Sequence, residues 1–230
     1  MLIDAANNWN GVQITNYLKS LGVSRIDYLI ATHAHADHIG GMDTIINNFE
    51  IGTIHMPDTD HPTLQMRQFL EAMLENDLQY ELVEIGDIIH LGNTVIEVLF
   101  VDNSMPATVN DASIVLQMTY GEKTYLFMAD AEKSTEDALK WDPVDVLRVG
   151  HHGSNTSSTR RFLEQTTPEI SIISVGEGNR YNHPRVEVLD RLAAVGSRIY
   201  RTDLHGTIWI SSDGSSLSIT LLSTLEETSI

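Results

Sequence analysis

A segment near the N-terminus that is rich in histidine reads Thr32-His33-Ala34-His35-Ala36-Asp37-His38. It follows an apolar run, residues 26–31, that is typical of a buried strand. In an extended segment alternate residues point the same way, so His33 and His35 can bind one metal ion together. Asp37 and His38 follow as the chain turns and can face a second ion. Dense His/Asp tracts of this kind are typical of metal binding rather than of an ordinary polar loop.

Polar side chains also follow two later predicted strands. Asp130 ends the run at residues 125–129, where a buried carboxylate is costly unless a cation neutralises it. Its alternative role is the N-cap of a helix that begins near residue 134. His151-His152-Gly153-Ser154 leaves the predicted strand at residues 144–149. We expect one imidazole to bind metal and the other to contact substrate or donate a proton to the leaving group, two surface histidines being the alternative.

Two further segments allow both a functional and a structural interpretation. Asn110-Asp111-Ala112-Ser113 is as typical of a turn as of a functional site, because Asx residues favour turns. His183 precedes a predicted helix, and the functional and structural interpretations are balanced. The remaining isolated histidines are interpreted as structural or surface residues: His55, His61, His90 and His205.

Composition narrows the classes of function. The chain has 230 residues, of which 42% are hydrophobic, so a single domain over residues 1–230 is expected. It has no cysteine, so any metal must be held by His and carboxylate side chains. Its net charge of −18, without a Lys/Arg cluster, favours solubility and disfavours DNA as a partner. No apolar run of about 20 residues and no signal peptide is visible, so we expect no membrane insertion and a cytoplasmic location, with other compartments left open.

Strand and helix patterns alternate along the chain. Helices are predicted at residues 40–48, 62–76, 134–140, 159–165 and 184–194. Strands are predicted at residues 26–31, 51–56, 82–85, 88–91, 94–101, 113–120, 124–128, 144–149 and 170–175, and near the C-terminus at 199, 207–210 and 217–221. This order predicts an α/β protein with two sheets, each covered by helices on one face.

The His33–His38 segment resembles the signature of the metallo-β-lactamase superfamily. One bacterial branch, the hydrolase domain of ComEC-type competence proteins, is similar over residues 2 to about 210. The segments that carry this closer resemblance are Asn110–Ser113, Asp130, His151–Ser154, Tyr181–Pro184 and Tyr200–Asp203. The resemblance implies an αββα sandwich that begins here without its first N-terminal strand. The glycine usual after Asp4 is replaced by Ala5-Ala6.

The resemblance also implies a set of metal ligands. His33 and His35 bind one ion, Asp37 and His38 the other, and Asp130 bridges them. His152 is the last ligand and His151 its substrate-facing neighbour, with the reverse order still open. Asp111, or else Asn110, stands where many members have a histidine. The implied cofactors are two divalent ions, and Zn²⁺ is the default. The carboxylate of Asp111 makes the site more suitable for Mn²⁺ or Fe than a site of histidines alone would be.

The functional hypothesis is a metal-dependent hydrolase that acts on a phosphodiester, either as a nuclease or on a small phosphoester. Two metal ions would activate water and bind the phosphoryl oxygens. Asp37 would orient the water, and His151 or His183 would stabilise charge or protonate the leaving oxygen. The alternative is a non-catalytic metal-binding or partner-binding module with a degenerate site. Metal content distinguishes the two hypotheses.

Overall fold

The computed structural model describes residues 1–59, 61–104 and 108–222. They form two compact units, one made of Met1–Glu84 with Val101–Ile114 and the other of Ile85–Phe100 with the chain from Val115 onward. Each unit has its own sheet, helices and hydrophobic core, so the α/β class is confirmed. None of the helices in the described ranges is long and apolar enough to cross a membrane.

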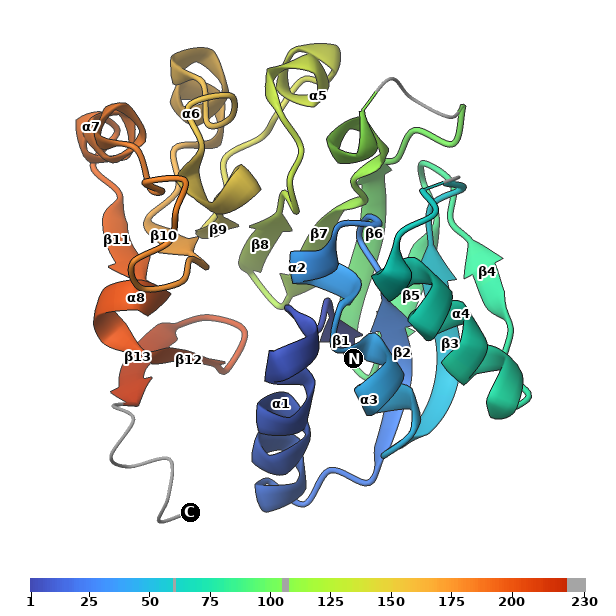
Figure 1. The fold of residues 1–230 in the computed structure, drawn as a ribbon. Coiled ribbons are helices and arrows are strands. Elements are labelled where there is room, and N and C mark those ends of the chain that lie inside the picture. Colours follow the sequence, from blue (N-terminus) through green and yellow to red (C-terminus); the bar gives the residue numbers. More distant parts are fainter. Residues whose placement is uncertain (60, 105–107, 223–230) are drawn as a thin grey trace. The chain divides into compact units, whose positions relative to one another are not determined.

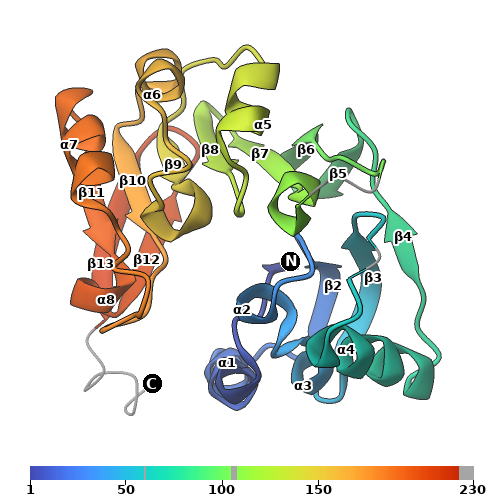
Figure 2. The same cartoon turned by 45° about the horizontal axis from the view of Figure 1, so that its top comes forward.

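The first unit is a parallel sheet covered by helices. Its strands run in the order β1-β2-β3-β4. Helices α1, α3 and α4 lie side by side against this sheet (Figures 1 and 2). The elements are β1 (Leu2–Ile3), α1 (Asn8–Ser20), β2 (Arg25–Ile30), α2 (Ala36–Ile39), α3 (Met42–Ile46), β3 (Glu50–Met56), α4 (Leu64–Glu75) and β4 (Tyr80–Leu82).

The core of the first unit explains this packing. Leu29 and Ile54 project from the sheet, Ile45 from α3 and Phe69 from α4, and none of the four is exposed to solvent. Burying each such side chain contributes about 1.5–3 kcal/mol. Because parallel strands end at the same edge of a sheet, β1 and β2 both deliver the residues that follow them to one place.

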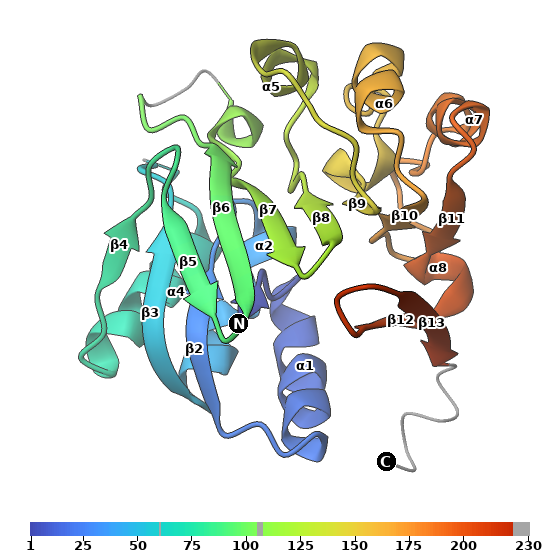
Figure 3. The same cartoon turned by 180° about the vertical axis from the view of Figure 1, so that it is seen from behind.

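The second unit is a seven-stranded sheet in the order β11-β10-β9-β8-β7-β6-β5, seen from behind in Figure 3. Strands β5 to β8 form an antiparallel meander, and β8 to β11 are parallel. The strands are β5 (Ile88–Leu91), β6 (Thr94–Phe100), β7 (Val115–Tyr120), β8 (Lys123–Phe127), β9 (Val146–Arg148), β10 (Ile170–Ile173) and β11 (Arg198–Arg201). The helices are α5 (Lys133–Ala138), α6 (Arg160–Thr166), α7 (Val186–Ala194) and α8 (Thr202–His205).

Opposite faces of this sheet are covered by different elements. Leu126 and Leu147 pack against Phe162 of α6 and Val188 of α7. Their neighbours along the strands point the other way and pack against the hairpin formed by β12 (Thr207–Ser212) and β13 (Leu217–Leu222). The expectation of two sheets was therefore incomplete, because this hairpin forms a third, two-stranded sheet.

Several predicted elements differ from those observed. Helix α1 was not predicted, because its sequence is polar and buries only Gly11 and Thr15. The helix predicted at 40–48 is observed as the shorter α3, and a separate helical turn that was not predicted, α2, precedes Gly40-Gly41. The strand predicted at 82–85 was wrong, since β4 pairs with β3 through Tyr80–Leu82 and has ended by residue 83.

Candidate metal centre

The His33–His38 segment leaves the end of β2 and is fixed there by hydrogen bonds. The Thr32 backbone N–H and hydroxyl both donate to the Asp4 carboxylate at 2.9 Å, and the Thr32 carbonyl accepts from the Ile114 N–H at 3.0 Å. Helix α2 then begins at Ala36, so Asp37 lies in its first turn with an exposed side chain. The segment is thus held from the strand into the helix.

Three imidazoles of the first unit pack ring against ring. The ring centroid of His33 lies 4.9 Å from that of His35 and 4.1 Å from that of His38. His33 Nε2 lies 3.1 Å from His35 Nδ1. Two nitrogen ligands at about 2.0–2.1 Å from one tetrahedral ion are roughly 3.4 Å apart. The observed separation therefore suits a shared ion, as the alternation of the sequence predicts.

Asp4 orients His38. Its Oδ2 lies 2.6 Å from His38 Nδ1, and since a carboxylate only accepts, this nitrogen carries the proton. Burial alone would raise the pKa of Asp4, but the imidazoles of His38 and His33 and the Thr32 N–H together hold it below its ordinary value. His38 is left with Nε2 as its lone-pair donor, the arrangement typical of metal-binding histidines.

The second unit carries another cluster of ligand type. Asp130 follows β8, and His151 and His152 follow β9, which is parallel to β8. Asp130 is 2% exposed; its Oδ1 lies 3.5 Å from His152 Nε2 and its Oδ2 lies 3.7 Å from His151 Nε2. These separations are long for hydrogen bonds and close to those of two ligand atoms on one ion. The N-cap of α5 is Glu132, so Asp130 does not have the alternative role of helix cap.

The two histidines of this cluster are oriented by different partners. His152 Nδ1 donates to the Ser174 carbonyl at 2.7 Å, and His151 Nδ1 donates to Glu132 Oε1 at 2.9 Å. Both residues and Gly153 have left-handed backbone, with φ of 47°, 53° and 79°. Each ring is consequently left with Nε2 as its lone-pair donor, and each Nε2 faces Asp130.

His183 lies beside this cluster. Its ring centroid is 5.8 Å from those of His151 and Tyr181, and it stacks on the latter. Asn179 holds its backbone, accepting from the His183 N–H at 2.9 Å and donating to its carbonyl at 2.7 Å. Burial, followed by the neighbouring imidazoles, lowers the pKa of His183.

The predicted site residues divide between the two units. His33, His35, Asp37, His38 and Asp111 belong to the first, and Asp130, His151, His152 and His183 to the second. Among the described residues, the side chains able to take part in holding a metal ion include His33, His35, Asp37, His38, Asp130 and His152. Asp111 lies in a 3-10 turn, Val109–Ala112, where its Oδ2 accepts from the Thr108 hydroxyl at 2.8 Å.

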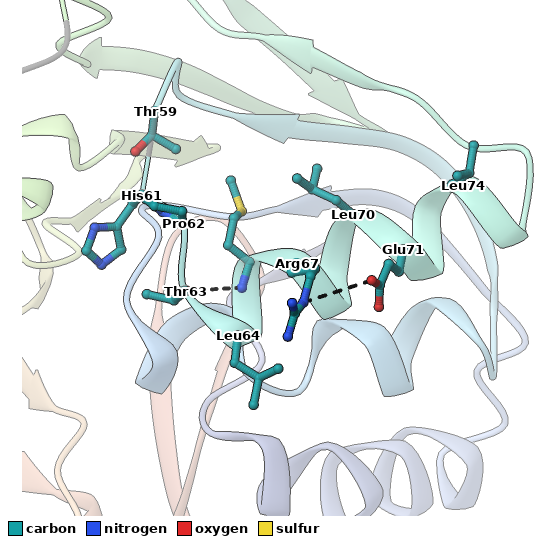
Figure 4. Close-up of a pocket in the computed structure, with 10 residues that line it drawn as sticks. Thr59, His61, Pro62, Thr63, Leu64, Arg67, Leu70, Glu71 and Leu74 are labelled. Carbon is teal, nitrogen blue, oxygen red and sulfur yellow. Dashed lines mark hydrogen bonds and ion pairs between the residues drawn. The ribbon is translucent and has the colours of Figure 1, made fainter.

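Sequence reasoning missed three orienting side chains and one neighbouring residue. The side chains that contact site histidines are those of Asp4, Glu132 and Thr32. The only sequence signal among them is a carboxylate at or near the end of a strand, which Asp4 and Glu132 show. His61 was interpreted as a structural or surface residue, yet its ring centroid lies 5.8 Å from that of His35. It also lines a groove of about 540 Å³ along α4, with Leu70 and Leu74 further along the helix (Figure 4).

Comparison with known proteins confirms the sequence resemblance. The sequence profile of the Metallo-beta-lactamase superfamily matches residues 1–177. ComE operon protein 3 of Bacillus subtilis is 34% identical over 196 residues, which are 84% of this chain and 25% of that protein. Competence protein ComA of Neisseria gonorrhoeae is 30% identical over 196 residues, 83% of this chain and 26% of that protein. The chain thus spans about a quarter of the length of these relatives.

Solved structures show the same fold at low sequence identity. CmlA, a diiron β-hydroxylase from Streptomyces venezuelae, superposes with a TM-score of 0.54 at 17% identity, covering 86% of this chain and 45% of that one. The metallo-beta-lactamase fold protein YhfI from Bacillus subtilis gives 0.51 at 12% identity, covering 76% and 74%. At these identities the likeness concerns the fold alone.

Proposed function

Because the chain belongs to the metallo-β-lactamase superfamily, we propose that it is a metal-dependent hydrolase whose two histidine clusters together hold a pair of divalent cations. The substrate is a phosphodiester. A phosphodiester suits a two-metal site, since two cations can bind the attacking and leaving oxygens of one displacement.

One observation carries the proposal: histidines in both clusters have Nδ1 on an oxygen acceptor. His38 Nδ1 contacts Asp4, His152 Nδ1 the Ser174 carbonyl and His151 Nδ1 Glu132. Such partners fix the tautomer and leave Nε2 with its lone pair, which in His38 and His152 would serve a metal ion. Histidines without a metal role would not need an oxygen acceptor on Nδ1 in each unit. A donor set of imidazole and carboxylate without sulfur suits Zn²⁺, Mn²⁺ or Fe.

The proposed ligands follow the predicted assignment. His33 and His35 hold one cation, Asp37 and His38 the other, and Asp130 is shared. His152 is the last ligand, supported by its short bond to a main-chain carbonyl and by its 3.5 Å approach to Asp130. Asp111, or else Asn110, would complete the set as the replacement for a histidine.

Divalent cations at such a site supply Lewis acidity and a water that ionises near neutral pH. The chain's own residues supply the rest. Asp37, exposed in the first turn of α2, orients the attacking water. His151 takes up a proton from water on Nε2 and passes it to the leaving oxygen as the bond from that oxygen to phosphorus breaks. His183, in ring contact with His151, stabilises the negative charge that develops on the leaving oxygen.

The test combines metal content with hydrolysis of bis-p-nitrophenyl phosphate. Protein purified without chelator is expected to contain close to two metal ions per chain and to hydrolyse this ester. Asp130→Ala is expected to lose both properties, whereas Asp142→Ala, at an exposed position, retains them. An Asp130→Ala protein with full activity would refute the proposed site. A metal-free wild type that is folded and inactive would instead support the non-catalytic module.

The two forms of phosphodiester substrate are distinguished by salt. A chain of net charge −18 is expected to engage a DNA strand only through its cations, with a weak dependence on salt. Cleavage of a single-stranded oligonucleotide with Mn²⁺ present, measured at rising salt, tests this. If the oligonucleotide is not cleaved while the small ester is, the substrate is a small phosphoester.

A further inference from the structure

Glu132 occupies the N-cap of α5, but its side chain does not cap that helix. The N-caps of α4 and α6 behave differently: Thr63 accepts from the Met66 N–H and Thr159 from the Phe162 N–H. Capping by a side-chain oxygen stabilises a helix by about 1 kcal/mol. Helix capping therefore does not account for where the Glu132 carboxylate lies.

The Glu132 carboxylate instead binds two side chains of the loop after β9. Its Oε1 accepts from His151 Nδ1 at 2.9 Å and from the Thr156 hydroxyl at 2.8 Å. Thr156 also contacts the Ser154 hydroxyl at 2.9 Å, and its carbonyl accepts from the Lys133 N–H at 3.0 Å. Glu132 is therefore fixed by Thr156 while it holds the ring of His151.

The backbone of His151 does not by itself determine how its ring is oriented. Its φ is 47°, and its N–H donates to the Ala129 carbonyl at 2.9 Å, which fixes the main chain. The side chain is 23% exposed, so solvent can reach the ring. Without a partner on Nδ1, a partly exposed imidazole exchanges between two tautomers and can turn its ring over.

We propose that Glu132 is a positioning residue for the hydrolysis: it holds His151 with the proton of the neutral ring on Nδ1, so that Nε2 is the atom that takes up a proton from water and passes it to the leaving oxygen. This inference rests on the proposed function. When the leaving oxygen takes the proton from Nε2, the neutral ring keeps its Nδ1 proton on Glu132. The next proton taken from water then returns to Nε2, and the ring is ready for another cycle.

Three variants separate positioning from a simple role in holding the loop. Glu132→Ala removes the acceptor of His151, and Glu132→Gln keeps an acceptor oxygen without the charge. Thr156→Val removes the link to the loop, and with it a hydroxyl that lies 3.3 Å from His151 Nδ1, but leaves Glu132 beside His151. Glu164→Ala, an exposed glutamate on α6, is the matched control. All are assayed with bis-p-nitrophenyl phosphate at one pH, with metal content measured on the same samples.

Glu132→Ala is expected to lower kcat by roughly 10–100-fold, the range typical of partners that orient site histidines, with KM and metal content within twofold of wild type. Glu132→Gln is expected to recover most of this loss, and Thr156→Val to lower kcat by less than about threefold. ¹⁵N NMR of the histidine rings is expected to show the Nδ1–H tautomer of His151 in wild type and a mixture in Glu132→Ala. A Glu132→Ala protein with unchanged kcat, or with the wild-type tautomer, overturns the inference.

Failure of this inference is distinguishable from failure of the proposed function. If Asp130→Ala abolishes hydrolysis while Glu132→Ala does not change it, the site stands and the positioning role falls. A loss in Thr156→Val equal to that in Glu132→Ala, with unchanged tautomer, assigns both residues to holding the loop and also overturns the inference.

Discussion

The two units present their histidines in different ways. In the first, three histidines lie within six residues, and their rings touch at centroid distances of 4.1 and 4.9 Å. In the second, His151 and His152 are adjacent, stand on left-handed backbone and have ring centroids 6.2 Å apart. Their orientation comes from Glu132 and Ser174, which lie 19 and 22 residues away in the chain. The first cluster is set mainly by local spacing, and the second by tertiary contacts.

The largest effect is expected from removing one ligand in each unit. His33→Ala and His152→Ala should both reduce hydrolysis below detection, because each removes a proposed ligand whose Nε2 faces another donor. His90→Ala, an exposed histidine on β5, serves as control and should behave as wild type. Activity is measured on bis-p-nitrophenyl phosphate and bound metal by mass spectrometry.

The outcome bears directly on the comparison. If His152→Ala keeps its metal and its activity while His33→Ala loses both, the first cluster suffices and the second has no part in binding. Equal losses mean that both clusters are required.

A large effect on stability is expected where the second cluster depends on glycine. Gly153 has a φ of +79°, and a Cβ there would lie 2.6 Å from Pro184 Cβ. Gly153→Ala should therefore lower the free energy of unfolding by roughly 2–5 kcal/mol, combining backbone strain with overpacking. Gly178, with a φ of +62° and open space around it, is the matched control and should lose only about 1–2 kcal/mol.

Urea unfolding of the metal-free proteins measures both losses. Equal losses in the two variants would show that Pro184 can move aside without a loss in the free energy of unfolding. The loop after β9 would then be less tightly held than its contacts indicate.

The histidines of the candidate site that lie close together in the sequence could be predicted, whereas the side chains that orient the site histidines could not. His33 and His35 were identified because their spacing alone places both on one side of an extended segment. Asp130 was identified because a carboxylate directly after a buried strand needs a partner. Asp4 and Glu132 escaped since their roles depend on which strand ends lie side by side, which no local pattern records.

The fold shows the same division. Strands with apolar runs, such as β3 and β6, were predicted to within a few residues. Helix α1 was missed because its contact with the neighbouring helix uses Gly11, whose absent side chain allows close approach to Gly41 and Thr44. Such a contact depends on a missing side chain, so hydrophobic periodicity gives no signal for it.

An intermediate effect is expected from the partner of His38. Asp4→Asn keeps an oxygen acceptor but removes the charge, and it can turn its NH₂ group toward the ring. Metal affinity should fall by roughly 10–100-fold, as for other partners of ligating histidines. Competition with a chromophoric chelator measures it, with the exposed Glu75→Gln on α4 as control. Unchanged affinity would mean that ring packing alone orients the first cluster, which would sharpen its contrast with the second.

The smallest effect concerns a buried carboxylate of the second unit whose pKa shift is opposite to that of Asp4. Glu136 accepts from the backbone N–H groups of Ser158 and Thr159, and is 3% exposed. Burial is the largest influence and outweighs these bonds, so the pKa of Glu136 is raised. Asp4, whose side chain is 12% exposed, faces imidazoles, and its pKa is lowered. The kind of partner, more than the depth of burial, decides the direction.

The sign of the pH dependence follows from this shift. With a raised pKa, the folded state binds more protons than the unfolded state above the ordinary value of 4.5. The contribution of Glu136 to stability is therefore complete below that pH and declines as the pH rises through the folded-state pKa. Glu136→Gln has no such titration, so the stability advantage of wild type over this variant, on the order of 1 kcal/mol, should shrink between pH 4.5 and 7. Urea unfolding of both proteins across this range measures it. An advantage that grows with pH would show that the two N–H donors outweigh burial, and Glu136 would then resemble Asp4.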